Sequence, residues 1–283
     1  MMAGSDLDLM MIYAHPQDVT ESRGARPLAA SQWFIRAAHS LVAAVTAPGA
    51  DGQLYAVDMR LRPSGNKGPV AVSLASFRRY HAEDAWTWER MALTRARVVA
   101  GAMPLRLLVQ EAIAEAIAAA GAPERVRADA AAMRARMRRD LPPDGVWDVK
   151  QRPGGLVDIE FIAQMLQLMW ARESRSVCSP NTCEALRRLA AAGKLDAADA
   201  ALLARADRVW RTVQGMLRIT VGRVTQGDLP EASLRALLRA VAEVGVVADD
   251  LAGLRVALDA LAAEVSAVFE RLVGRTEEAQ RRG

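Results

Sequence analysis

Two aspartates close to the start of the chain have the residue type and the spacing of a metal site. Asp6 and Asp8 lie in the segment G-S-D-L-D-L, where leucines alternate with them. In a β-strand, residues two apart face the same side, so we expect both carboxylates on one face and the leucines on the other. Carboxylates that lie this close repel each other. Mg²⁺, which prefers oxygen ligands, would stabilise such a pair.

A third aspartate lies on a second extended segment, V-D-M-R-L-R-P-S-G. If the two segments pair side by side, Asp58 joins Asp6 and Asp8 on one face. Carboxylates from adjacent strands can hold two metal ions for in-line attack on a phosphate. Arg60 and Arg62 continue the alternation of Asp58, and the guanidinium group matches phosphate oxygens well. The pattern therefore predicts a site for a metal-bound triphosphate.

The loop that follows Pro63 adds hydrogen-bond donors and a cation, namely Ser64 and Lys67 among glycines. A D-x-D pair taken alone is common and more often lies on the surface or caps an element. The second segment makes a binding site the better interpretation. Charged residues are rarely buried without a partner, and this apolar strand carries an aspartate and two arginines on one face. Metal and phosphate binding is the economical explanation.

The elements that must position these residues change character near residue 100. Before it, strands are predicted over 7–14 and 54–61, with a helix over 29–47 between them and turn-forming residues over 46–53. Strand, helix, strand indicates a domain of the α+β class. After it, apolar residues recur with helical period, and helices are predicted over 103–120, 124–140, 155–172, 182–193, 196–222, 231–244 and 248–273.

The helical segments predict an all-α bundle after the first domain, and a chain that is predominantly helical. The stretch 141–155 is rich in Pro and Gly and is expected to form a hinge. We therefore expect a partial catalytic domain over 1–102, connecting helices over 103–145 and a helical bundle over 146–283.

Composition narrows the function classes. The chain has 283 residues, of which 52% are hydrophobic, 25% charged and only 5% aromatic, which suits a globular helical protein. A net charge of +4 is too small to predict a nucleic-acid partner. Cys178 and Cys183 lack the partners of a zinc site, and no segment has the length of a membrane span. We expect a cytoplasmic protein.

Four blocks in sequence order resemble the nucleotidyltransferase domain of the glutamine synthetase adenylyltransferases. They are G-S-D-L-D-L, V-D-M-R-L-R-P-S-G, the stretch 83–101 (EDAWTWERMALTRARVVAG) and the stretch 150–164 (KQRPGGLVDIEFIAQ). The resemblance covers about residues 4–170, and beyond that it rests on helical character. The combination of R-L-R-P-S-G with D-A-W-T-W-E is similar to the half of these enzymes that adds AMP.

The resemblance implies a reaction, its cofactors and its partners. AMP would pass from ATP to a tyrosine hydroxyl of glutamine synthetase, with Mg²⁺ held by Asp6, Asp8 and Asp58. Those three carboxylates would be the catalytic residues. A PII-type regulatory protein is a further expected partner. The residues expected to contact the nucleotide are Gly4, Ser5, Arg60, Arg62, Ser64 and Lys67.

One departure from the family pattern leaves alternatives open. Family members carry a glycine-rich G-K-L-G-G segment before the first acidic motif, whereas only Met1, Met2 and Ala3 precede Gly4. We therefore expect a catalytic domain that is incomplete at its N-terminal side. The alternatives are the AMP-removing half, a PII uridylyltransferase-like enzyme, or an inactive fragment that acts as a helical binding module. An RNA-directed nucleotidyltransferase would require a more basic surface.

Overall fold

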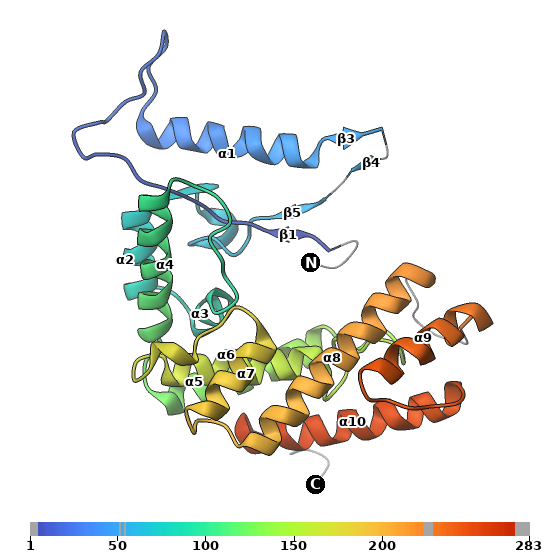
Figure 1. The fold of residues 1–283 in the computed structure, drawn as a ribbon. Helices are drawn as coiled ribbons and strands as arrows, with labels where there is room; N and C mark the ends of the chain where they lie inside the picture. The colour runs from blue at the N-terminus through green and yellow to red at the C-terminus, as the bar shows by residue number, and fades with distance from the viewer. Residues whose placement is uncertain (1–4, 51, 54, 223–228, 275–283) are drawn as a thin grey trace. The chain divides into compact units, whose positions relative to one another are not determined.

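The structure is a computed structural model that describes residues 5–50, 52, 53, 55–222 and 229–274 (Figure 1). Its contacts divide the chain into two compact units, Met1–Ala119 and Ala120–Gly283. The expected predominance of helix is confirmed, because helices account for most of the described residues in both units.

Unit 1 contains three pairs of short strands, two of which join segments far apart in the sequence. The first two pairs are parallel and the third is an antiparallel hairpin. The pairs are β1 (Leu7–Asp8) with β5 (Val57–Asp58), β2 (Met11–Tyr13) with β6 (Ala71–Ser73), and β3 (Pro48–Gly49) with β4 (Gly52–Gln53). The predicted strand 54–61 is thus shorter than expected, since its pairing ends at Asp58 and turns follow from Arg60.

The helices of unit 1 pack against these strands and against each other. They are α1 (Ala30–Thr46), α2 (Leu74–Glu83), α3 (Thr87–Leu93) and α4 (Met103–Ala118), with a 3₁₀ turn, η1 (Gly65–Lys67). Ser73 starts α2 by accepting a hydrogen bond from the Ser76 N–H at 3.1 Å. α4 packs against α2 and α3. Phe77 is fully buried in the core of this unit.

The regular elements in the described residues of unit 2 are all helices, as the apolar periodicity predicts. Its central helix is α6, which packs against α5, α7, α8 and α10 and buries most of its side chains. The helices are α5 (Pro123–Asp140), α6 (Leu156–Trp170), α7 (Thr182–Ala191), α8 (Ala197–Thr220), α9 (Glu231–Glu243) and α10 (Leu251–Leu272), with the 3₁₀ turn η2 (Arg175–Val177).

A buried charge cluster fixes the start of α6. The Asp158 carboxylate is fully buried and accepts hydrogen bonds from Arg134 at 2.6 Å, Arg138 at 2.7 Å and the Gly154 N–H at 2.7 Å. The Trp210 indole N–H donates to the Gly154 carbonyl at 3.1 Å. A buried carboxylate is stable only when it is paired and hydrogen-bonded in this way. Asp158 therefore has a structural role.

None of the helices in the described part of the chain combines the length and the apolar character needed to cross a bilayer.

Candidate active site

Asp8 and Asp58 lie at the same level on neighbouring strands. β1 and β5 run parallel, with Leu7 paired to Val57 and Asp8 paired to Asp58 (Figure 1). The Leu7 N–H donates to the Ala56 carbonyl at 2.8 Å. Paired residues of adjacent strands project to the same face of a sheet. The expected side-by-side pairing of the two segments is confirmed, and the metal-binding role of the carboxylates stays a prediction.

The charges around Asp8 form an acidic cluster. Partial burial raises the pKa of Asp8, and the negative charges of Asp58 and Asp6 raise it further. The positive charges of Arg60 and Arg95 act in the opposite direction. All three predicted carboxylates are therefore close enough to interact. Their mutual repulsion favours a cation beside them.

Asp58 already has a cationic partner in the structure. Arg60 donates to its carboxylate through Nε at 2.7 Å, through its backbone N–H at 2.8 Å and through Nη2. These hydrogen bonds lower the pKa of Asp58. The bond from the Arg60 side chain has the largest effect, and the bond from its backbone N–H the next largest. The guanidinium group of Arg60 is largely open to solvent. The ion pair is therefore open to solvent on its Arg60 side, and the role of Arg60 in triphosphate binding stays a prediction.

Arg62 has a different environment from Arg60. Its side chain is buried, with 8% exposed, and it donates to the carbonyl of Gly68 at 3.1 Å and to that of Met59 at 2.7 Å. The alternation expected for the two arginines does not reach Arg62, because strand pairing ends at Asp58. In the structure Arg62 closes the loop that follows the strand. Its assignment to triphosphate binding stays a prediction.

The same loop exposes the other predicted nucleotide contacts. Ser64 adopts a left-handed backbone, with φ of 62°, and Gly65 follows with φ of 54°. The side chains of Ser64 and Lys67 are exposed. The N–H groups of Gly65, Lys67 and Gly68 donate to carbonyls within the loop, at 2.8, 3.1 and 3.1 Å. Ser5 is half-buried beside β1, and Gly4 lies outside the described residues.

The donor set has the chemistry that Mg²⁺ requires. Carboxylate oxygens from β1 and β5 lie at the same register and carry excess negative charge. Over the residues that the structure describes, no group of three or more His, Cys, Asp or Glu side chains is already arranged around a common centre. Binding of a divalent ion would therefore require Asp58 to turn away from Arg60.

One residue near the cluster, and one pair of residues that joins two helices, were not placed by the sequence. Arg95 acts electrostatically on Asp8 from the turn that follows α3. Tyr80 on α2 and Glu89 on α3 are joined by hydrogen bonds of 2.8 and 3.0 Å. For Glu89, the sequence signal was its position three residues after Trp86, which is the position of the glutamate in a capping box at the start of a helix.

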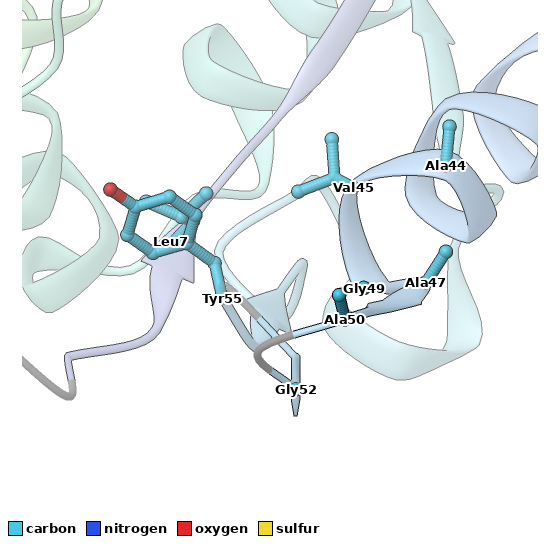
Figure 2. Close-up of a pocket in the computed structure, with 8 residues that line it drawn as sticks. All are labelled: Leu7, Ala44, Val45, Ala47, Gly49, Ala50, Gly52 and Tyr55. Carbon is cyan, nitrogen blue, oxygen red and sulfur yellow. The ribbon is translucent and has the colours of Figure 1, made fainter.

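An open cavity of about 600 Å³ lies on another part of unit 1. Figure 2 shows side chains from the end of α1, the β3–β4 hairpin and Tyr55 around it. No charged side chain lines it; the lining residues are Leu7, Ala44, Val45, Ala47, Gly49, Ala50, Gly52 and Tyr55. Because Leu7 alternates with Asp6 and Asp8, this apolar cavity faces away from the carboxylates. It does not have the chemistry of a triphosphate site.

Comparison with known families divides the chain in a similar way. Residues 1–112 match the family model described as "Glutamate-ammonia ligase adenylyltransferase". Residues 124–273 match the model described as "GlnD PII-uridylyltransferase". The first match contains the acidic cluster and the loop that follows it, and the second falls within the helical unit.

Curated relatives match almost the whole chain. The bifunctional glutamine synthetase adenylyltransferase/adenylyl-removing enzyme of Rhizobium meliloti (strain 1021) is 40% identical over 276 residues, which is 96% of this chain and 27% of the relative. The protein of the same description from Rhodopseudomonas palustris (strain TIE-1) is 38% identical over 274 residues, which is 97% of this chain and 27% of the relative. The chain thus spans about a quarter of the length of these relatives.

Proposed function

Because the chain belongs to the glutamate-ammonia ligase adenylyltransferase family, we propose that unit 1 transfers AMP from ATP to a tyrosine hydroxyl of glutamine synthetase. The tyrosine oxygen forms a bond to the α-phosphorus, the bond from that phosphorus to the bridging oxygen breaks, and pyrophosphate leaves. The hydroxyl proton passes to the acidic cluster. The observation that carries the proposal is the parallel register that sets Asp8 beside Asp58.

Asp6, Asp8 and Asp58 would hold Mg²⁺ in this reaction. The ions, when bound, neutralise charge on the triphosphate and on the attacking oxygen. The excess negative charge around Asp8 supports this assignment. Arg60, released from Asp58, would contact the triphosphate, and Arg95 would add positive charge from the turn after α3. Phosphoryl transfer depends mainly on such positioning and charge stabilisation.

The loop after Asp58 would hold the phosphate end of the nucleotide. Ser64 contributes a hydroxyl and the Lys67 ammonium contributes a point charge, and both side chains are exposed. These side chains, rather than the loop backbone, would contact the phosphates, because the N–H groups of Gly65, Lys67 and Gly68 donate to carbonyls within the loop. Arg62 would hold the loop closed through its hydrogen bonds to the Gly68 and Met59 carbonyls. Ser5 and Gly4 would approach the phosphates from the other strand.

The direct test is AMP incorporation into purified glutamine synthetase with α-labelled ATP and Mg²⁺. The parent chain is expected to label the synthetase, and Asp8→Asn and Asp58→Asn are each expected to lower the rate at least about 100-fold, the scale of lost electrostatic stabilisation. Asp18→Asn, an exposed aspartate outside the cluster, should leave the rate unchanged. Equal rates for parent and both cluster variants would refute the site.

The same preparation separates the alternative activities. The AMP-removing reaction would release ADP from adenylylated glutamine synthetase in the presence of phosphate. A uridylyltransferase would transfer label from UTP to a PII-type protein. A folded chain that performs none of these reactions would leave the helical binding module as the remaining function.

A second proposal concerns the helical unit alone. The match of residues 124–273 to a PII-uridylyltransferase model favours a PII-type protein as the partner of this unit. Titration calorimetry of the full chain with a PII-type protein tests it. A saturable heat supports the proposal, and no heat at protein concentrations well above micromolar contradicts it.

A further inference from the structure

We propose that Arg60 is a built-in competitor for the metal site, which holds the Asp58 carboxylate until a triphosphate offers Arg60 another partner. The hydrogen bonds between Arg60 and the Asp58 carboxylate form this device, the Asp58–Arg60 latch. The proposal deepens the function proposed above and rests on it, because it takes Asp58 as a ligand of a divalent ion. It adds a coupling between ligands: the chain binds the metal weakly by itself and more tightly together with the nucleotide.

The latch engages both oxygens of one carboxylate. The Arg60 backbone N–H donates to Asp58 Oδ1 at 2.8 Å, Nε of the guanidinium group donates to Oδ2 at 2.7 Å, and Nη2 donates to the same oxygen. Where a chain turns, an aspartate commonly accepts from the backbone N–H two residues later. Strand pairing ends at Asp58, so Arg60 occupies that position. A divalent ion needs carboxylate oxygens, and the guanidinium group already holds one of them.

The latch acts on only one of the three predicted metal ligands. Among the residues that the structure describes, no hydrogen bond to the carboxylate of Asp6 or Asp8 is found, and both side chains are exposed. Asp8 lies beside Asp58 in the parallel register of β1 and β5. Arg60 therefore leaves an incomplete donor set, in which the carboxylates on the β1 side are open and the one on β5 is engaged.

Exposure indicates which partner of the latch is freer to move. The side chain of Arg60 is 72% exposed, whereas that of Asp58 is 15% exposed. Asp58 is also fixed by its strand, since its carbonyl accepts a hydrogen bond from the Leu9 N–H at 2.9 Å. Arg60 lies in the turn after the strand. Its side chain can leave the carboxylate without disturbing β5, whereas the buried side chain of Arg62 is held by two carbonyls.

The strength of the latch sets the size of the effect. Exposed ion pairs contribute little, and the more favourable ones change an equilibrium about 5-fold. The forked contact and the limited exposure of Asp58 place the latch at the upper end of that range. A site that is open for only a fraction of the time has its affinity reduced by that fraction. Without nucleotide, the latch should therefore weaken metal binding about 5-fold, and a phosphate that binds Arg60 would remove this cost.

The Arg60→Gln variant should have opposite effects on two ligands. Its affinity for Mn²⁺ alone, an ion that shares the preference of Mg²⁺ for oxygen ligands, should rise about 5-fold because Asp58 is free. Its affinity for an ATP analogue with a methylene group between the α- and β-phosphorus, in saturating Mn²⁺, should fall about 10-fold because a charge-assisted hydrogen bond to phosphate is lost. Electron paramagnetic resonance measures free Mn²⁺, and calorimetry measures binding of the analogue. Arg26→Gln, at an exposed arginine outside the cluster, should change neither affinity.

A second comparison separates the latch from the general effect of a positive charge. Removing a cation near carboxylates would by itself favour metal binding through Asp6 and Asp8. In an Asp58→Asn background, the latch has no charged partner, so adding Arg60→Gln should leave the affinity for Mn²⁺ unchanged. A rise of the same size with and without the Asp58 carboxylate would show a general charge effect and overturn the latch.

The outcomes also separate the latch from the proposed function. Failure of both the parent chain and Arg60→Gln to bind Mn²⁺, with or without the analogue, would contradict the proposed function and the latch with it. A parent chain that binds the analogue, while Arg60→Gln keeps the parent's affinity for Mn²⁺ alone, would contradict the latch only. Lower thermal stability of Arg60→Gln with unchanged affinity for Mn²⁺ would show that Arg60 only stabilises the turn, which also overturns the latch.

Discussion

Asp8 and Asp158 are the same residue type, but their neighbours give them different tasks. Asp8 lies among other carboxylates, and burial with the charges of Asp58 and Asp6 raises its pKa. Asp158 is enclosed by Arg134 and Arg138 in a core where no solvent reaches it. The first arrangement has negative charge to offer a cation, whereas the second is already neutralised. Charge balance, rather than residue type, separates the proposed site from the scaffold.

His81 is a buried titratable side chain with no task in the proposed reaction. It is 3% exposed, and neither of its ring nitrogens has a hydrogen-bond partner in the structure. Burial, with the charge of Arg90, lowers its pKa from 6.5 to about 4. The unfolded chain therefore binds a proton between these values that the folded chain does not. By linkage, this residue makes the free energy of unfolding fall as pH falls through that window.

We expect His81→Leu to remove part of this acid sensitivity. His81 lowers the free energy of unfolding by about 3 kcal/mol as the pH falls from 7 to 4, because its pKa is lower in the folded chain than in the unfolded chain. Urea unfolding measured from pH 7 to pH 4.5 should show a shallower loss of stability in the variant. His39→Leu, an exposed position on α1, should keep the slope of the parent. Equal slopes for His81→Leu and the parent would contradict the prediction.

At the scale of elements, the turns that begin and end helices decide which glycines are replaceable. Gly154 precedes α6 with φ of 71°, and a Cβ there would lie 1.9 Å from the Ala262 carbonyl oxygen on α10. Gly193 follows α7 with φ of 67°, but a Cβ there would meet nothing within 4 Å. Both need a left-handed backbone. Only Gly154 also needs the absence of a side chain.

This difference gives a matched pair of substitutions. Gly154→Ala should lower the free energy of unfolding of unit 2 by more than about 3 kcal/mol, because strain and overpacking add. Gly193→Ala should cost only about 1 kcal/mol, the strain of the left-handed backbone. Thermal unfolding followed by circular dichroism measures both. A similar loss for the two variants would show that the α6–α10 contact is not tight.

At the scale of the whole molecule, the two units differ in how their cores are built. Unit 1 relies on strand pairs of two or three residues and on helices that cover them. Unit 2 has a helical core in which the side chains of Trp210, Leu186 and Phe269 are fully buried. Helices with such a core are stabilised by packing among themselves. Unit 2 has the features of an independently folding domain.

We therefore expect residues 120–283 to fold when produced alone. The fragment should give a helical circular dichroism spectrum and a single cooperative thermal transition. The Leu186→Ala variant should lower the free energy of unfolding by about 2–5 kcal/mol, as truncation of a fully buried leucine does. A spectrum without a cooperative transition would show that the helical unit depends on unit 1.

The sequence by itself determined the features that depend on local period and residue type. Helical periodicity predicted a helix over 29–47, which is observed as Ala30–Thr46, and predicted helices that correspond to those of unit 2. Alternation around Asp6 and Asp8, with a second acidic strand, predicted that Asp58 would lie beside them. Such patterns are readable because each residue's face follows from its neighbours in the chain.

Only the tertiary structure decided where that alternation stops and how the following helices are joined. Strand pairing ends at Asp58, so Arg60 turns back to its carboxylate while Arg62 is buried in the loop. The Tyr80 hydroxyl on α2 donates to the Glu89 carboxylate on α3, a contact between two helices that no local pattern predicts. The physical reason is that loop closure and hydrogen bonds between separate elements depend on packing between distant segments, which spacing along the chain does not specify.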